Sequence, residues 1–305
     1  MHIHVLGSAA GGGFPQWNCN CRNCDGVRKA TVRARARTQS SIALSGDGVN
    51  WLLCNASPDL LSQLRAFPQS QPARALRDTA IAAVLLIDAQ IDHTTGLYML
   101  REHHRPLQVW CTDPVAEDLE RGNPLLGLLG HYCGARRHRI PIDGTAFEIA
   151  DVPGLRLTAL PLRSKAPPYS PHRDEPVAGD NIGLLVECTH AGKRLFYAPG
   201  LGEIEPQVWQ AMLDCDVLMI DGTCWRDDEL IALGVSRKRA RDMGHLPLHG
   251  TGGTLDWLDR LPRATRKILI HINNTNPILD EDSVEHARVR SAGIELAFDG
   301  MELSL

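Results

Sequence analysis

Short runs of Val, Ile and Leu recur along the chain, and stretches with helical spacing separate some of them. The apolar runs are of strand length, and most are bounded by Gly, Pro, Asn or Asp, as buried β-strands typically are. We predict strands at residues 2–6, 41–44, 49–55, 81–88, 107–111, 155–160, 182–188, 194–198, 217–221, 267–272 and 294–298. Helical spacing predicts helices at residues 58–67, 94–103, 114–120, 206–213, 252–261 and 283–292. Because strands outnumber helices and several follow one another directly, the pattern favours an α/β fold of sheets with outer helices over a regular βαβα alternation.

Length and composition narrow the class of protein. With 305 residues, of which 43% are hydrophobic, the chain is able to bury one large core, and we predict a single domain over residues 1–305. The formal net charge of −4 argues against nucleic acid and anionic membranes as partners and favours a small substrate or a protein. The longest apolar run, residues 81–87, is far shorter than the roughly 20 residues of a membrane helix. Residues 1–10 also lack the charged start of a signal peptide, so we expect a cytoplasmic location and leave the oligomeric state, including a homo-oligomer, open.

Three of the nine cysteines stand close together. Cys19, Cys21 and Cys24 lie in a polar loop over residues 11–29 that begins with three glycines, whereas most of the others sit singly in apolar runs, as reduced core thiols do. Three thiols within six residues can converge on one tetrahedral ion, and thiolate is a soft ligand that selects zinc. A cluster of packed thiols is the alternative. We predict a structural Zn²⁺ at this loop, with water, an acidic residue or His271 as the fourth ligand.

Two apolar strands end in residues that bind metals. Asp92 and His93 follow the predicted strand at 81–88, and His271 lies near the end of the predicted strand at 267–272. Ligands commonly gather at the ends of buried strands in α/β proteins, although an Asp-His pair alone is more often a solvated turn and a strand His a core residue. Two imidazoles and one carboxylate form the set that holds non-haem Fe²⁺ and leaves positions open for O₂ and substrate.

The segment Asp88-x-Gln90-x-Asp92-His93-x-x-Gly96 resembles the His-x-His-x-Asp-His signature of the metallo-β-lactamase superfamily, with its first two histidines replaced. Residues 55–59, 195–200 and 269–272 resemble other motifs of that superfamily, and the cysteine loop with residues 298–302 resembles its phosphodiesterase branch. The resemblance implies an αββα sandwich, in which two mixed sheets carry outer helices.

Departures from the superfamily pattern decide the chemistry that the resemblance implies. Hydrolases of this type use up to five histidines and a bridging carboxylate to hold two zinc ions that activate water. Here Asp88 and Gln90 replace two histidines, and Arg163 or Ser164 lies where the middle histidine should be. Pro199 occupies the position of the bridging Asp. Asp92, His93 and His271 remain as an active-site iron set with a catalytic role, so a dinuclear hydrolase is the least favoured reading.

Longer matches narrow the resemblance to one family. Residues 7–21, 37–41, 167–172 and 271–277 are similar to those of a family of pyrroloquinoline quinone (PQQ) biosynthesis proteins. The resemblance implies an iron-dependent hydroxylase that acts on the tyrosine ring of a peptide-derived Glu-Tyr precursor, with other PQQ biosynthesis proteins as partners. The alternative is a non-catalytic carrier that takes PQQ or its precursor towards the periplasm.

Such a substrate carries carboxylates and a ring, which suggests its contacts. An arginine recognises a carboxylate with two parallel hydrogen bonds, and aromatic side chains stack on rings. Each arginine is as readily a solvated surface residue, and Trp17 could equally pack over the cysteine loop. His172 and His245 fall in the predicted long loops 163–181 and 223–253. The candidate contacts are Arg37, Arg163 and Arg173 for carboxylates, and Trp17, Tyr169 and His172 for the ring.

Overall fold

The computed structural model describes all 305 residues and contains two seven-stranded sheets. The first sheet has the order β14-β1-β2-β3-β4-β5-β6 and the second has the order β13-β12-β11-β10-β9-β8-β7. The strands of the first sheet are β1 (His2–Gly7), β2 (Ser41–Ser45), β3 (Trp51–Cys54), β4 (Ile81–Leu85), β5 (Leu107–Cys111), β6 (Ala135–Arg139) and β14 (Glu302–Ser304). Those of the second are β7 (Phe147–Glu148), β8 (Leu155–Pro161), β9 (Ile182–Cys188), β10 (Arg194–Ala198), β11 (Val217–Asp221), β12 (Arg266–Ile270) and β13 (Ile294–Leu296).

Both sheets are mixed in the same way. From β14 to β3 the neighbouring strands are antiparallel, and from β3 to β6 they are parallel. The second sheet repeats this arrangement, antiparallel from β7 to β10 and parallel from β10 to β13. The carboxyl ends of the parallel strands β4, β11 and β12 therefore lead into the loops that carry the predicted site.

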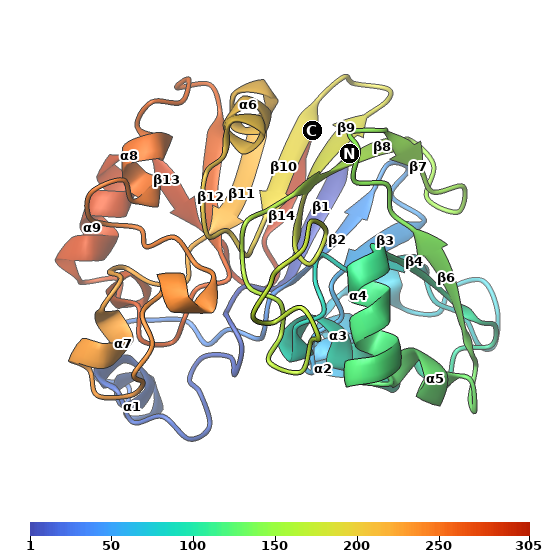
Figure 1. The fold of residues 1–305 in the computed structure, drawn as a ribbon, viewed down its shortest axis with the longest axis horizontal. Coiled ribbons are helices and arrows are strands. Elements are labelled where there is room, and N and C mark those ends of the chain that lie inside the picture. The colour runs from blue at the N-terminus through green and yellow to red at the C-terminus, as the bar shows by residue number, and fades with distance from the viewer.

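Helices cover the outer face of each sheet (Figure 1). Around the first sheet lie α2 (Leu60–Ala66), α3 (Ile91–Thr94), α4 (Asp113–Glu117) and α5 (Leu125–Leu129). On the side of the second sheet lie α6 (Pro206–Asp214), α7 (Glu229–Ala232), α8 (Thr254–Leu258) and α9 (Val284–Ser291), and α1 (Arg22–Arg28) contains Cys24 and follows Cys19 and Cys21. The two mixed sheets with outer helices confirm the predicted αββα architecture.

Three apolar clusters explain the layers. The central cluster joins inward-facing residues of both sheets, such as Leu52 of β3 and Met219 of β11. A second packs Leu218 of β11 against α6, α8 and α9, and a third packs the first sheet against α2, α4 and α5. Parallel strands are buried on both faces, which is why β11 is a continuous apolar run. No helix is long and apolar enough to cross a membrane.

Candidate metal centre

Asp92 and His93 lie in α3, directly beyond the end of β4. The Ala56 backbone N–H donates to His93 O at 2.7 Å, and the Gly96 N–H donates to Ala56 O at 2.8 Å. A Cβ atom at Gly96 would lie 2.2 Å from Ser57 O, so only glycine allows this approach of two backbones. The glycine three residues after His93 thereby fixes the short helix against the turn that follows β3.

His271 follows β12 in a left-handed backbone conformation, with φ +59°. This conformation is strained for a residue other than glycine and turns the side chain off the line of the strand. Backbone bonds hold it, because the Ile272 N–H donates to Ser8 O at 3.0 Å and the Gly222 N–H donates to Ile270 O at 2.7 Å. The imidazole consequently points towards Asp92.

The three predicted iron ligands converge. Asp92 Oδ2 lies 3.4 Å from His271 Nε2 and 3.8 Å from His93 Nε2. The Nε2 atoms of both histidines are buried and have no hydrogen-bond partner. A buried unpaired ring nitrogen costs about 1–3 kcal/mol, and two of them beside one carboxylate fit a metal ion as the missing partner. Asp92, His93 and His271 are thus able to hold one ion between them.

The Nδ1 atoms of the same histidines have oxygen partners that turn Nε2 towards Asp92. His93 Nδ1 lies 2.8 Å from Asp88 Oδ1, and His271 Nδ1 lies 2.9 Å from Thr223 Oγ1. A metal-ligating histidine generally donates its other N–H to such a group, which sets the tautomer and the ring orientation. Asp88, at the first histidine position of the superfamily signature, therefore supports a ligand instead of acting as one.

Asp221 and Thr223 form a second hydrogen-bonded group, which the sequence analysis missed. Asp221 ends β11 and is buried, and its Oδ2 lies 2.6 Å from His245 Nδ1. Thr223 Oγ1 donates to Asp221 Oδ1 at 2.6 Å and lies 3.2 Å from His245 Nδ1. The ring of His245 stacks on that of His271, with 5.3 Å between their centroids. The ligand atoms of Asp221, His245 and His271 also lie within 4.8 Å of one another. The Nδ1 atoms of both histidines are already engaged with Asp221 or Thr223, so in this structure Asp221, Thr223 and His245 buttress His271.

Charge is balanced within the candidate centre. Burial disfavours the charged form of His93, but the carboxylates of Asp88 and Asp92 outweigh it and raise its pKa to about 9. Burial would raise the pKa of Asp92, yet His93 and His271 hold it well below its usual range. A bound cation takes over the role of the histidine proton, so metal binding here releases protons.

The other superfamily ligand positions hold no metal-binding group aimed at Asp92. Gln90 donates from Nε2 to Lys165 O at 3.0 Å, and Ser164 donates from Oγ to Gly244 O at 2.8 Å. Pro199 does not line the pocket, whereas its neighbour Gly200 does, and the assignment of Pro199 to the bridging position stays a prediction. A Cβ atom at Gly200 would lie 4.0 Å from Asp88 Oδ2, and glycine offers no ligand there.

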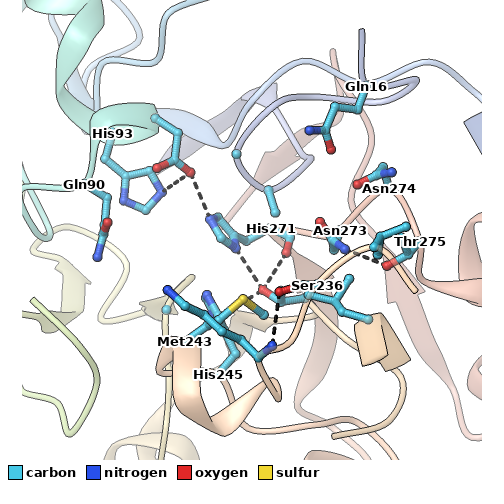
Figure 2. Close-up of a pocket in the computed structure, with 18 of the residues that line it drawn as sticks. Gln16, Gln90, His93, Ser236, Met243, His245, His271, Asn273, Asn274 and Thr275 are labelled. Carbon is cyan, nitrogen blue, oxygen red and sulfur yellow. Dashed lines mark hydrogen bonds and ion pairs between the residues drawn. The ribbon is translucent and has the colours of Figure 1, made fainter. Parts of the chain in front are cut away.

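A pocket of about 620 Å³ opens above the centre. Its walls are rich in amide side chains, among them Gln16, Gln90, Asn273 and Asn274 (Figure 2). The pocket therefore suits a polar ligand that forms many hydrogen bonds.

Most of the predicted substrate contacts lie outside this pocket, and Arg173 alone of the six lines it. Trp17 is 85% exposed, and Arg163 pairs with Glu205 at 3.0 Å. The other three are engaged elsewhere: Tyr169 donates its hydroxyl to Ala89 O, His172 lies 3.2 Å from Glu117, and Arg37 is buried against Ser8 and Ala297. The structure thus brings only Arg173 to the pocket, and the role of the other five as substrate contacts stays a prediction.

Cys19, Cys21 and Cys24 converge at the start of α1 with their sulfur atoms within 4.8 Å of one another. Burial and the neighbouring thiols raise the pKa of Cys21 to about 12, so this thiol ionises at neutral pH only with a cation beside it. Asn274 places its side-chain amide 3.3 Å from Cys24 Sγ and 3.7 Å from Cys21 Sγ. His271, considered as a fourth ligand, faces Asp92 instead.

The fold and the Asp-His centre are those of a metallo-β-lactamase-type protein, and a family model described as a beta-lactamase superfamily domain matches residues 50–272. A coenzyme PQQ synthesis protein B from Azoarcus sp. strain BH72 is 67% identical over 305 residues and covers 100% of both chains. The crystal structure of Zn²⁺-bound PqqB from Methylobacterium extorquens has a TM-score of 0.90 at 37% identity, again over 100% of both chains. A diphosphatase of the PhnP family, with a TM-score of 0.70 at 17% identity over 100% of this chain and 97% of that one, shares the fold. The chain belongs to the coenzyme PQQ synthesis protein B family.

Proposed function

We propose that this protein is a mononuclear, iron-dependent hydroxylase of PQQ biosynthesis, acting on the tyrosine ring of a Glu-Tyr-derived precursor. One observation carries the proposal: two unpartnered imidazole nitrogens and one carboxylate converge, while two histidine positions of the dinuclear pattern hold Asp88 and Gln90. Two histidines and one carboxylate suit non-haem Fe²⁺, and too few ligands remain for a dinuclear hydrolase.

The residues of the chain have separable tasks in this reaction. Asp92, His93 and His271 would hold the iron, which supplies O₂ activation when bound. Asp88 and Thr223 keep both Nε2 atoms aimed at that point. The reaction places one oxygen atom of O₂ in a ring C–H bond, and the other leaves as water with two electrons and two protons from an external reductant. The polar pocket positions the precursor over the centre.

Reconstitution tests the hydroxylase. The protein is loaded with Fe²⁺ without air, then given a Glu-Tyr dipeptide, a reductant and O₂, and the products are analysed by mass spectrometry. We expect a product one oxygen heavier in the native protein and none in Asp92→Asn, with ¹⁸O₂ as the source of the added atom. Absence of that product in the iron-loaded native protein would contradict the proposal.

The same preparation distinguishes the alternatives. Tight binding of PQQ or its precursor without turnover in any metal form favours the carrier. Hydrolysis of a phosphodiester or lactam probe by the zinc-loaded protein favours residual hydrolase activity.

We also propose that Cys19, Cys21 and Cys24 hold a structural Zn²⁺. The convergence of three thiols supports this, as does their contact with the side-chain amide of Asn274. A half-turn of that amide would bring its oxygen to the place of its nitrogen. Asn274 would then offer Oδ1 as the fourth ligand.

A further inference from the structure

Two cationic side chains line the pocket from two different loops. Arg173 comes from the segment between β8 and β9, and Lys238 comes from the segment between β11 and β12. Neither lies within ion-pair distance of a carboxylate, although other arginines of these loops do. Arg163 pairs with Glu205 at 3.0 Å and Arg239 with Asp227 at 3.5 Å. Arg173 and Lys238 are therefore cations that the protein itself does not neutralise.

The carboxylates inside the pocket are already committed. Asp88 accepts from His93 and from the Gln90 N–H at 2.9 Å, and Asp92 faces His93 and His271. No acidic side chain of the pocket is left for a cation at its rim. A ligand with its own carboxylates would supply the missing charge.

Hydrogen bonds between and within the two loops position Arg173 and Lys238. Ser164, in the loop of Arg173, donates to Gly244 O of the other loop at 2.8 Å. Arg173 donates from Nη1 to Ala166 O, which fixes the guanidinium and leaves its other N–H groups for a bidentate partner. The Lys238 N–H donates to Ser236 Oγ at 3.1 Å, and Ser236 also lines the pocket (Figure 2).

We propose that Arg173 and Lys238 recognise two carboxylates of the substrate and select a dicarboxylate phenol over neutral phenols. The phenol in this assignment rests on the proposed function, whereas the carboxylate recognition rests on the two unpaired cations. Arg173 binds one carboxylate through two parallel hydrogen bonds, and Lys238 attracts the other as a point charge.

Binding without turnover tests the assignment. The iron-loaded protein is titrated calorimetrically without O₂, once with the Glu-Tyr dipeptide and once with Gln-Tyr-amide, which has nearly the same shape and lacks both carboxylates. We expect Arg173→Ala and Lys238→Ala each to weaken dipeptide binding about 10-fold or more and to change amide binding less than about 2-fold. Arg237→Ala, which removes the same charge next to Lys238 but outside the pocket, should bind the dipeptide like the native protein.

Three outcomes overturn the assignment: unchanged dipeptide affinity in either variant, an equal loss for both ligands, or no dipeptide binding by the native protein. Melting temperatures of the variants exclude misfolding as a cause of lost affinity. Because O₂ is absent, the result does not depend on hydroxylation. A native protein that binds the dipeptide selectively but makes no product when O₂ is added contradicts the proposed function and leaves the carboxylate recognition intact.

Discussion

Asp88 Oδ1 lies 2.8 Å from His93 Nδ1, so a carboxylate at a metal-ligand position of the superfamily signature has become the support of a neighbouring ligand. We expect Asp88→Ala to weaken metal binding at the active site about 10- to 100-fold, because His93 loses its tautomer and orientation. A chelator competition assay measures this. Asp143→Asn, at an exposed loop position, is the control and should bind metal like the native protein. Native affinity in Asp88→Ala would show that the carboxylate plays no part in holding the metal.

The hydroxyl of Thr223 links His271 to Asp221 through hydrogen bonds. Its Oγ1 contacts His271 Nδ1 at 2.9 Å and Asp221 Oδ1 at 2.6 Å. Thr223→Val keeps the shape and removes the hydroxyl, which leaves His271 Nδ1 buried and unpaired at a cost of about 1–3 kcal/mol, whereas Asp221 Oδ1 keeps its bond from the residue 223 N–H. We expect a lower free energy of unfolding in urea and weaker metal binding, with both restored in Thr223→Ser. Native stability and native metal affinity in Thr223→Val would show that the hydroxyl plays no part in supporting His271.

The charge on His93 predicts the pH dependence of the metal-free protein. Its pKa is about 9 in the fold, against an ordinary 6.5. A raised histidine pKa stabilises the fold fully below pH 6.5, and this contribution is lost as the pH rises through 9. The melting temperature of the metal-free protein should therefore fall between pH 6.5 and 9. Asp88→Asn should flatten the profile, whereas an equally steep fall in that variant would exclude His93 as its source.

Gly96 allows α3 to approach the turn after β3. A Cβ atom there would lie 2.2 Å from Ser57 O, so Gly96→Ala must move the segment that carries His93. We expect a loss of about 1–3 kcal/mol in the free energy of unfolding together with weaker metal binding. Gly127 in α5 is the matched control, because a Cβ atom there meets nothing within 4 Å. Gly127→Ala should stabilise the protein by about 0.5–1 kcal/mol.

The proposed zinc site at Cys19, Cys21 and Cys24 predicts how the zinc content changes on substitution. Cys21→Ser should remove zinc and lower the melting temperature, because a structural site contributes its binding free energy to folding. Asn274→Ala should weaken zinc retention under chelation, while Asn20→Ala, a change at an exposed residue beside Cys21, should not. Full zinc occupancy in Cys21→Ser, measured by elemental analysis, would refute the assignment of this loop.

The fold could be predicted where burial imposes a pattern. The strand β11 is buried on both faces and reads as a continuous apolar run, whereas β6 is a largely exposed edge strand with the sequence Ala-Arg-Arg-His-Arg and gives no apolar signal. The predicted helix at 94–103 is instead a 3₁₀ segment over Thr95–Leu100 that follows α3. Gly96, in this segment, packs against the backbone of Ala56 and Ser57 in the turn after β3. The helix α1 was missed because the cysteines and polar residues around it show no helical spacing.

The candidate site could likewise be predicted where its residues follow a buried strand. Asp92, His93 and His271 were found because each lies where an apolar strand ends. Asp221 ends its strand in the same way, so the signal was present but was not connected to the site. Contacts between loops, such as the bond from Ser164 to Gly244, depend on tertiary packing and leave no periodic pattern in the sequence.

His271 and Asn274 belong to one short turn, in which the first faces Asp92 and the second contacts Cys21 and Cys24. A chemical change at Cys21 or Cys24 would therefore affect the position of His271. Cys19 and Cys21 are partly exposed, and peroxide would convert accessible thiols to sulfenic and higher acids. Oxidation of the cysteine loop would release Asn274 and loosen the turn that keeps His271 strained, so the position of His271 at one end of this turn depends on reduced sulfur at the other.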